Sequence, residues 1–104
     1  MWTLEEEYDE TISEAGGKLL CIDFYATWCG PCKLMGPKFE KLADEFKDCV
    51  FAKIDVDETA VEDVVDESNI KVMPTFILLK EGQEVARLEG NVPDQLREAI
   101  ESHK

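Results

Sequence analysis

The chain has 104 residues, enough for one domain, and 44 % of them are hydrophobic, which is ordinary for a globular protein. Twenty-four acidic residues face 11 basic ones, giving a formal net charge of -13 at pH 7. This charge argues against nucleic acid and anionic membrane surfaces as partners, because both are bound through basic residues. It favours solubility, with the steering of basic partners as the alternative.

No apolar run approaches the ~18 residues that a membrane span requires. The N-terminus, MWTLEEEYDE, has neither the basic region nor the apolar region of a signal peptide. Four cysteines are too few for a disulfide-dense secreted scaffold. We therefore expect a cytoplasmic protein.

A helix is predicted over 3–15, where apolar residues recur at helical spacing and acids occupy the other face. Thr3 and Glu6 fit a capping box at its start. The pair Gly16-Gly17 is expected to end it. The apolar positions are Leu4, Tyr8, Ile12 and Ala15.

Residues 19–25, LLCIDFY, are apolar except for Asp23, which is typical of a strand buried on both faces. A helix is predicted over 31–46, with a kink at Pro37, where one backbone hydrogen bond is lost. A second strand, VFAKIDV, covers 50–56. Strand, helix and strand in this order make a right-handed βαβ unit. The inward residues of the helix are Met35, Phe39, Leu42, Ala43 and Phe46.

The second half of the chain predicts a helix, a hairpin and a last helix. The first of these helices covers about 59–68, with three valines facing inward, and an antiparallel hairpin pairs 75–80 with 84–89 around Glu81-Gly82-Gln83. Pro93 opens the last helix. These elements indicate an α/β protein with a central mixed sheet and helices on both faces. The inward residues of the two helices are Val61, Val64, Val65, Leu96, Ala99 and Ile100.

Two cysteines three positions apart, Cys29 and Cys32, lie where the first strand passes into a helix. Residues i and i+3 of a helix have Cβ atoms about 5–6 Å apart, so a small shift reaches the ~3.5–4.5 Å that a disulfide needs. Unpaired N–H groups and the helix dipole stabilise negative charge here, so we expect a lowered pKa for the Cys29 thiol. Pro31 starts the helix without wasting a donor. Gly30 lets another chain approach the sulfur, and Lys33 adds positive charge.

We assign Cys29 as the attacking nucleophile and Cys32, one turn deeper, as the resolving thiol. Cys29 attacks a partner's disulfide and forms a mixed disulfide. Cys32 then attacks Cys29, which releases the reduced partner and leaves a Cys29–Cys32 bond.

The cysteine pair has other possible roles. A CxxC can be half of a zinc site, but Cys21 and Cys49 form no second such pair and the chain has one histidine, His103. The same lack of a paired histidine disfavours a Cys–His hydrolase. A purely structural pair stays open, although Gly-Pro between the cysteines suits a turn better than a helix interior. We expect no metal.

WCGPCK after a strand, with an Asp six positions before the first Cys, resembles the thioredoxin family, of which CxxC near a βαβ unit is the known signature. The resemblance implies one thioredoxin domain over 1–104, with four to five strands flanked by four helices, the first strand shrunk to a stub at 2–4. It covers almost the whole chain through CIDFYATWCGPCK (21–33), FAKIDVDE (51–58), VMPTFILLKEG (72–82) and EGNVPDQL (89–96).

The resemblance also implies a function, namely that of a protein disulfide reductase without a bound cofactor. Thioredoxin reductase, drawing on NADPH, would recharge it. Its clients would be disulfide-containing proteins such as peroxiredoxins or ribonucleotide reductase, and we expect a monomer. A disulfide oxidase or isomerase is one alternative, disfavoured by CGPC in place of CGHC. A non-catalytic binding module is the other.

Asp23 interrupts an apolar strand, and burial of a lone carboxylate is costly and raises its pKa. The family assigns the matching Asp to proton transfer with the buried thiol. The resemblance therefore makes Asp23 the general base for Cys32, directly or through a water, with Lys53 as its partner from the adjacent strand. The alternative is a satisfied buried polar group with no catalytic part.

From the sequence alone we expect the bond between Met73 and Pro74 to be trans, since only ~5–6 % of X–Pro bonds in folded proteins are cis. The resemblance reverses this expectation and places a cis-Pro beside the cysteines, leaving Met73 backbone groups for an extended substrate segment. Plain packing is the alternative for most groove positions. By resemblance the groove comprises Trp28, Gly30, Pro31, Val56, Met73, Pro74 and Gly90.

Three residues stand apart from this pattern. Tyr25 occupies a place where many relatives carry Trp. Cys21 falls in the apolar strand and is expected to be an inert core residue. Cys49 falls in a predicted turn, where we expect an exposed thiol without a function. The alternatives are glutathionylation of this thiol or formation of a dimer through it.

Overall fold

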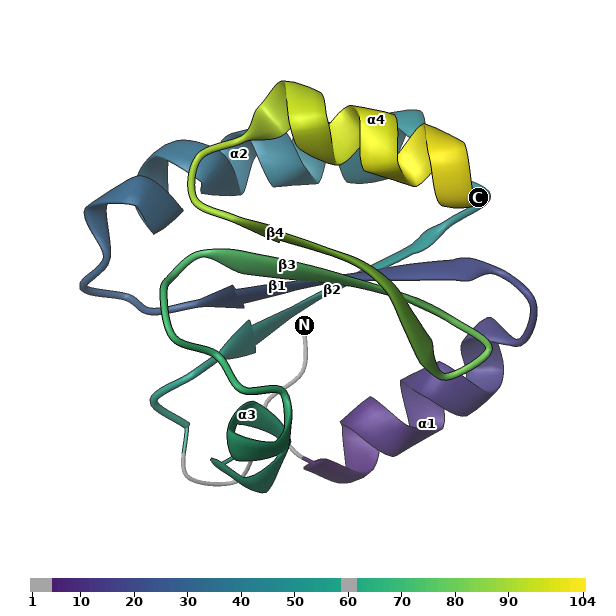
Figure 1. Ribbon diagram of the computed structural model, residues 1–104, viewed down its shortest axis with the longest axis horizontal. Helices are drawn as coiled ribbons and strands as arrows, with labels where there is room; N and C mark the ends of the chain where they lie inside the picture. Colours follow the sequence, from purple (N-terminus) through teal and green to yellow (C-terminus); the bar gives the residue numbers. More distant parts are fainter. Residues whose placement is uncertain (1–4, 59–61) are drawn as a thin grey trace.

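A mixed sheet runs through the middle of the molecule, with helices above and below it (Figure 1). The computed structural model describes residues 5–58 and 62–104. Within these residues the sheet has four strands in the order β2-β1-β3-β4. β1 pairs with β2 in parallel and with β3 antiparallel, and β3 pairs with β4 antiparallel. The strands are β1 (Leu19–Tyr25), β2 (Val50–Asp55), β3 (Thr75–Lys80) and β4 (Gln83–Glu89).

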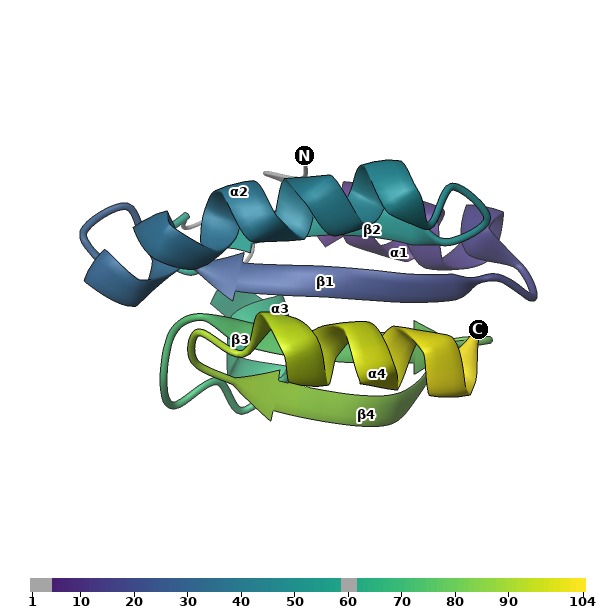
Figure 2. The same ribbon diagram turned by 90° about the horizontal axis from the view of Figure 1, so that it is seen from above.

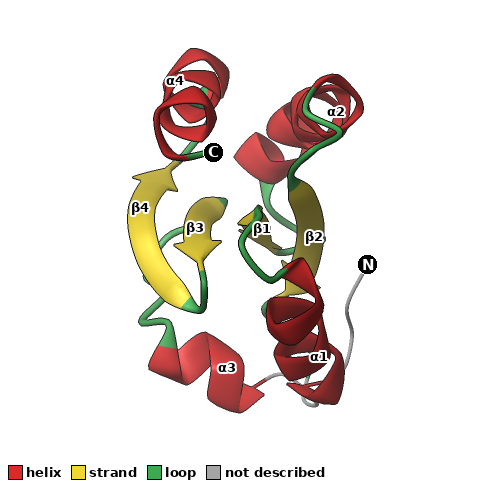
Figure 3. Cartoon of the chain, turned by 90° about the vertical axis from the view of Figure 1, so that its right-hand side faces the viewer, coloured by secondary structure: helices red, strands yellow, loops and turns green. Residues whose placement is uncertain are grey.

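In the described part of the chain, two helices cover each face of the sheet, which Figure 3 shows end-on. The helices α1 (Glu5–Ala15) and α3 (Glu62–Glu67) lie on one face, and α2 (Gly30–Glu45) and α4 (Pro93–His103) on the other. From above, α2 and α4 lie side by side, α2 over the β1–β2 half of the sheet (Figure 2). This arrangement has the thioredoxin-like layering that the sequence predicts.

The central strand β1 contributes side chains to both cores. Leu20, Ile22 and Phe24 pack with α1 and α3, whereas Leu19 and Cys21 pack with α2 and α4. Because successive strand residues point to opposite faces, Asp23 lies on the α2 face. The continuous apolar run of this strand therefore has the cause that was predicted, which is burial on both sides.

Most predicted bounds agree with the structure to within a residue. The strands predicted over 19–25 and 75–80 have the observed limits. The helix predicted over 31–46 begins at Gly30 and ends at Glu45, because Cys29 already serves as its N-cap. The strand predicted over 50–56 ends at Asp55, whose carboxylate accepts a hydrogen bond from the Asp57 backbone N–H and turns the chain.

Two further boundaries differ for local reasons. β4 begins at Gln83 instead of 84, because the turn consists of Glu81 and Gly82, both with positive φ (54° and 80°). α1 ends at Ala15, and Gly16 follows with a φ of 57°, which is the predicted glycine stop.

Some predictions lie outside the described residues. These are the strand stub at 2–4, the capping box that Thr3 would form, and the inward placement of Val61 in a helix predicted over 59–68. The observed α3 covers Glu62–Glu67, and its Val64 is buried. Among the described helices, none combines the length and apolar character needed to cross a membrane.

Candidate active site

The sulfurs of Cys29 and Cys32 are joined as a disulfide at the N-terminal end of α2. Their Cα atoms are 5.2 Å apart. Cys29 is the N-cap of the helix, in extended conformation, and Gly30 and Pro31 form its first positions. The Cys32 backbone N–H donates a hydrogen bond to Cys29 Sγ over 3.2 Å. The pair thus lies at the N-terminal end of a helix, as predicted, and a backbone N–H of that helix end is directed at the sulfur of Cys29.

Neither cysteine is widely open to solvent, since Cys29 is 4 % exposed and Cys32 is 7 % exposed. Cys32 is the third residue of α2 after the N-cap Cys29, so it lies about one turn deeper in the helix, as predicted. What distinguishes the two sulfurs is the hydrogen bond donated to Cys29. The predicted groove residues Val56 and Met73 pack against the pair, together with Tyr25.

The loop before β3, which contains Met73 and Pro74, lies close to Cys29. The Met73–Pro74 bond is cis, as the resemblance implied and the sequence statistics did not. The Met73 carbonyl oxygen lies 3.5 Å from Cys29 Sγ. The Gly90 N–H donates to the Pro74 carbonyl over 2.8 Å, and Gly90 has a φ of 91°, which favours glycine at this position. Gly90, which is itself a predicted groove residue, therefore holds the loop at Pro74 in place.

Trp28 is 66 % exposed beside the disulfide. Its indole N–H donates to the Asp57 carboxylate over 2.7 Å. Asp57 was not among the predicted site residues. The sequence does contain a signal for this contact. Residues that follow two neighbouring parallel strands meet at one edge of the sheet, and Trp28 follows β1 while Asp57 follows β2.

Asp23 is 3 % exposed, and its Oδ1 has no hydrogen-bond partner among the described residues. Burial raises the pKa of the Asp23 carboxyl to about 7, and the charge of Lys53 counteracts part of this rise. The predicted rise is confirmed.

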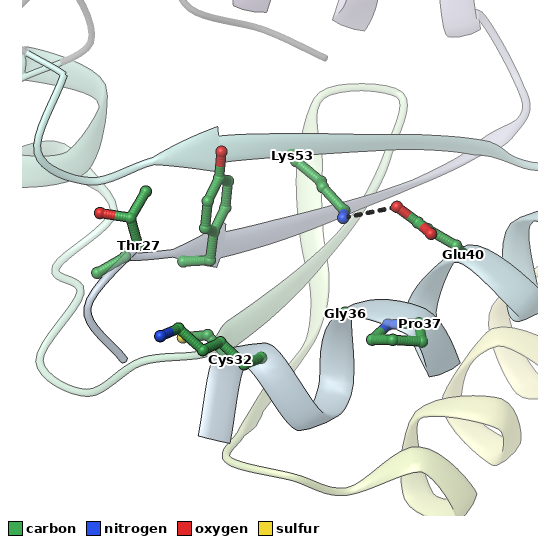
Figure 4. Close-up of a pocket in the computed structure, with 9 residues that line it drawn as sticks. Thr27, Cys32, Gly36, Pro37, Glu40 and Lys53 are labelled. Carbon is green, nitrogen blue, oxygen red and sulfur yellow. Dashed lines mark hydrogen bonds and ion pairs between the residues drawn. The ribbon is translucent and has the colours of Figure 1, made fainter. Parts of the chain in front are cut away.

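Lys53 is the register partner of Asp23 on the neighbouring strand β2. Its ammonium, however, pairs with Glu40 of α2, with 3.1 Å between Nζ and Oε1 (Figure 4). The predicted partner of Asp23 is therefore adjacent to it in the sheet but is hydrogen-bonded to Glu40, which was not among the predicted site residues. A helix residue facing a neighbouring strand leaves no local sequence signal.

Lys53 and Glu40 line a pocket of about 330 Å³ that reaches Cys32. Figure 4 shows that these side chains come from different elements, Lys53 from β2 and Glu40 and Cys32 from α2. The pocket gives solvent a route toward the Cys32 side of the disulfide. Its lining comprises Tyr25, Ala26, Thr27, Cys32, Lys33, Gly36, Pro37, Glu40 and Lys53.

The other two cysteines are free thiols in the core beneath α2 and α4. Cys21 is 0 % exposed, as predicted. Cys49 is only 9 % exposed, so the expectation of an exposed thiol is wrong. Its backbone N–H donates to the Phe46 carbonyl, and its side chain packs in the core with residues of α2 and α4. Burial raises the pKa of both thiols. Within 5–58 and 62–104, no three His, Cys, Asp or Glu residues are grouped to hold a metal ion.

Comparison with known proteins agrees with this geometry. The thioredoxin family model matches residues 1–102. Thioredoxin-2 of Saccharomyces cerevisiae is 45 % identical over 97 residues, which cover 93 % of this chain and 90 % of the yeast protein. The X-ray structure of Fasciola hepatica thioredoxin is 40 % identical with a TM-score of 0.93, covering 98 % of this chain and 96 % of the other.

A yeast structure concerning the thiol resolving mechanism of a mitochondrial 1-Cys peroxiredoxin via glutathione and thioredoxin systems is also similar. It is 40 % identical with a TM-score of 0.86, covering 97 % of this chain and 92 % of the other. Thioredoxins are thiol–disulfide oxidoreductases, and the Cys29–Cys32 disulfide at the start of α2 provides that chemistry here. The matched family model, the sequence identities and the shared fold agree that the chain belongs to the thioredoxin family.

Proposed function

We propose that this thioredoxin-type disulfide reductase uses Cys29 to attack the disulfides of client proteins and Cys32 to resolve the mixed disulfide. The observation that carries this order is the hydrogen bond from the Cys32 N–H to Cys29 Sγ. An N–H at a helix N-terminus stabilises the thiolate, which is the attacking form of a thiol. The donor belongs to the backbone, so reduction of the disulfide does not remove it.

The reaction has two exchanges. In the first, the Cys29 thiolate bonds to one sulfur of a client disulfide, and the client's other sulfur leaves as a thiolate that takes a proton. In the second, Cys32 gives up its proton and its sulfur attacks Cys29 Sγ. The client's remaining sulfur leaves, and the Cys29–Cys32 bond forms. Two electrons have then passed from the pair to the client.

Asp23 is proposed to accept the proton of Cys32 in the second exchange, directly or through a water. Its side chain lies on the sheet face that α2 covers, with an unpaired oxygen. A base works best when its pKa lies near the operating pH, and the pKa of Asp23 is about 7. Lys53 is proposed to assist as the cation adjacent to Asp23.

A shallow apolar groove around the disulfide is proposed to hold an extended client segment. The Met73 carbonyl beside Cys29 Sγ is available to pair with a client N–H. Val56 contributes apolar packing, and Trp28 is held at the rim by Asp57. The cis-Pro74, Gly90, Gly30 and Pro31 complete this groove in the proposal.

The finer features of the function are also proposals. Thioredoxin reductase, using NADPH, would reduce the disulfide after each cycle, with no cofactor bound to the chain itself. A peroxiredoxin is a supported client, because the yeast relative was studied in that context, and ribonucleotide reductase is proposed by family resemblance. We further propose one domain over 1–104, acting as a monomer in the cytoplasm.

Insulin reduction tests the function, with NADPH and thioredoxin reductase supplying electrons. We expect turnover with the wild-type chain and none with Cys29→Ser. Activity retained by Cys29→Ser would contradict the proposed nucleophile, and a wild-type chain without turnover would favour the non-catalytic binding module. The reduction potential of the Cys29–Cys32 couple separates a reductase from an oxidase or isomerase, since oxidases have less negative potentials.

A further inference from the structure

Lys53 has two carboxyl groups as neighbours, those of Asp23 and Glu40. Asp23 is its register partner on the parallel strand β1, and neighbouring strands are only about 4.8 Å apart. Phe51 packs with α2, so by strand alternation Lys53, like Asp23, is on the α2 face. The Lys53 ammonium pairs with Glu40 over 3.1 Å, while Asp23 Oδ1 has no partner among the described residues. Within the described residues, the Lys53 ammonium is therefore hydrogen-bonded to the Glu40 carboxylate and not to the Asp23 carboxyl.

We propose that Glu40 is a positioning residue for the second exchange, holding the Lys53 ammonium in the pocket and away from Asp23. This inference rests on the proposed role of Asp23 as the base for Cys32. Glu40 pairs with Lys53 and not with the sulfurs. It acts through Lys53.

The surroundings of Asp23 make the position of Lys53 decisive. On its own strand the titratable neighbours are Cys21 and Tyr25, which are acids and contribute no positive charge. Phe76, its register partner on β3, is apolar. Lys53 is the cation that lowers the pKa of Asp23. From α2 the facing groups are Cys32, Glu40 and the apolar Met35 and Phe39, and from α4 they are the apolar Leu96 and Ile100.

A Lys53 ammonium that turned fully toward Asp23 would stabilise the carboxylate and lower its pKa. The carboxylate would then be a weaker base for the Cys32 thiol. Glu40 opposes this movement from the solvent side, since its side chain is 67 % exposed against 19 % for Lys53. The Glu40 side chain is exposed and carries no core packing, so Glu40→Gln is expected to free the ammonium without unfolding the helix.

The test is Glu40→Gln in the reduced full-length chain, with the Asp23 carboxyl followed by carbon NMR as a function of pH. The pKa of Asp23 is expected to fall by about one pH unit, the lower end of the effect of an opposite charge within about 4–6 Å. The inflection of the client-release rate is expected to move to lower pH with it. Asp44→Asn removes an equal charge from the exposed side of the same helix and is expected to change neither.

A double-mutant comparison separates action through Lys53 from a direct effect of the Glu40 charge. In a Lys53→Met background, Glu40→Gln is expected to leave the Asp23 titration unchanged. An unchanged Asp23 pKa in the single Glu40→Gln variant would overturn the inference, as would an equal shift in both backgrounds. Asp23→Asn tests the underlying proposal independently: a release profile that is unaffected by Asp23→Asn refutes the base role, whatever the titrations give.

Discussion

The backbone N–H of Cys32 donates a hydrogen bond to Cys29 Sγ over 3.2 Å, so the resolving residue supports the sulfur of the attacking residue. The donor is an amide of the first turn of α2, one of the four N–H groups that a helix leaves unpaired. The spacing of the CxxC pair thus serves two purposes. It brings the sulfurs to bonding distance, and it directs a helix amide at Cys29.

This hydrogen bond predicts a reactive thiol in the reduced chain. Cys29 is expected to react with iodoacetamide at lower pH than an ordinary cysteine, because the amide and the helix dipole lower the pKa of its thiol. Alkylation rates measured against pH, with mass spectrometry to assign the site, check this. Buried Cys21 and Cys49 serve as internal controls and are expected to stay unreactive. A Cys29 profile like that of an unfolded peptide would contradict the proposed activation.

Cys32→Ser is expected to trap clients as stable mixed disulfides. The substitution removes the resolving sulfur but keeps the backbone N–H that stabilises Cys29. Client adducts should therefore persist on a non-reducing gel and disappear after treatment with a reductant. The matched variant Cys29→Ser is expected to trap nothing. If adducts formed through Cys32 instead, the order of attack would be reversed.

Asp23→Asn is expected to slow release of the reduced client near neutral pH, because the asparagine cannot accept the proton of Cys32. In the wild-type chain the release rate should rise with pH through about 7, where the Asp23 carboxyl ionises. Single-turnover release from a preformed mixed disulfide, followed by stopped flow, measures this. Equal rates in the two proteins would remove the base role.

The same substitution predicts a change in how stability depends on pH. The pKa of Asp23 rises from 3.8 to about 7 on folding, so between these values the folded chain holds a proton that the unfolded chain lacks. Stability from this group is therefore lost as pH rises toward 7. Between about pH 5 and about pH 8 the wild type should lose about 2–3 kcal/mol relative to Asp23→Asn.

Urea unfolding of the two oxidised proteins at both pH values measures this difference, and all other titrating groups cancel in the comparison. Parallel pH dependence in the two proteins would show that the Asp23 carboxyl titrates as it does in the unfolded chain.

Asp57→Ala is expected to weaken client binding by releasing the indole of Trp28 from its hydrogen bond. An exposed hydrogen bond contributes about 0.5–1.5 kcal/mol, so KM for a client should rise about two- to tenfold. Asp57→Asn keeps an acceptor oxygen and should recover most of the loss. Glu58→Gln, a neighbouring exposed acid, is the charge control. A similar loss in all three variants would point to net charge instead of the position of Trp28.

The chemistry of the pair was predictable from sequence because it is local. The spacing of Cys29 and Cys32, the glycine and proline between them, and the strand before them are contiguous, and they determine where a helix starts. Asp23 was detectable for a similar reason, since a single acid in an apolar strand breaks a local pattern. The elements α2, β1 and β3 followed from local patterns of apolar and turn residues, with errors of at most one residue.

The partners of these residues were decided by the tertiary structure. Lys53 pairs with Glu40 across 13 positions, and Trp28 with Asp57 across 29. Cys49 is buried because its turn folds under α2 and α4, although turns are usually exposed. By itself the sequence determined which atoms react and at which helix end, since neighbours along the chain set both. Which charges surround those atoms depended on packing a helix against a strand, because contacts between distant segments leave no trace in local pattern.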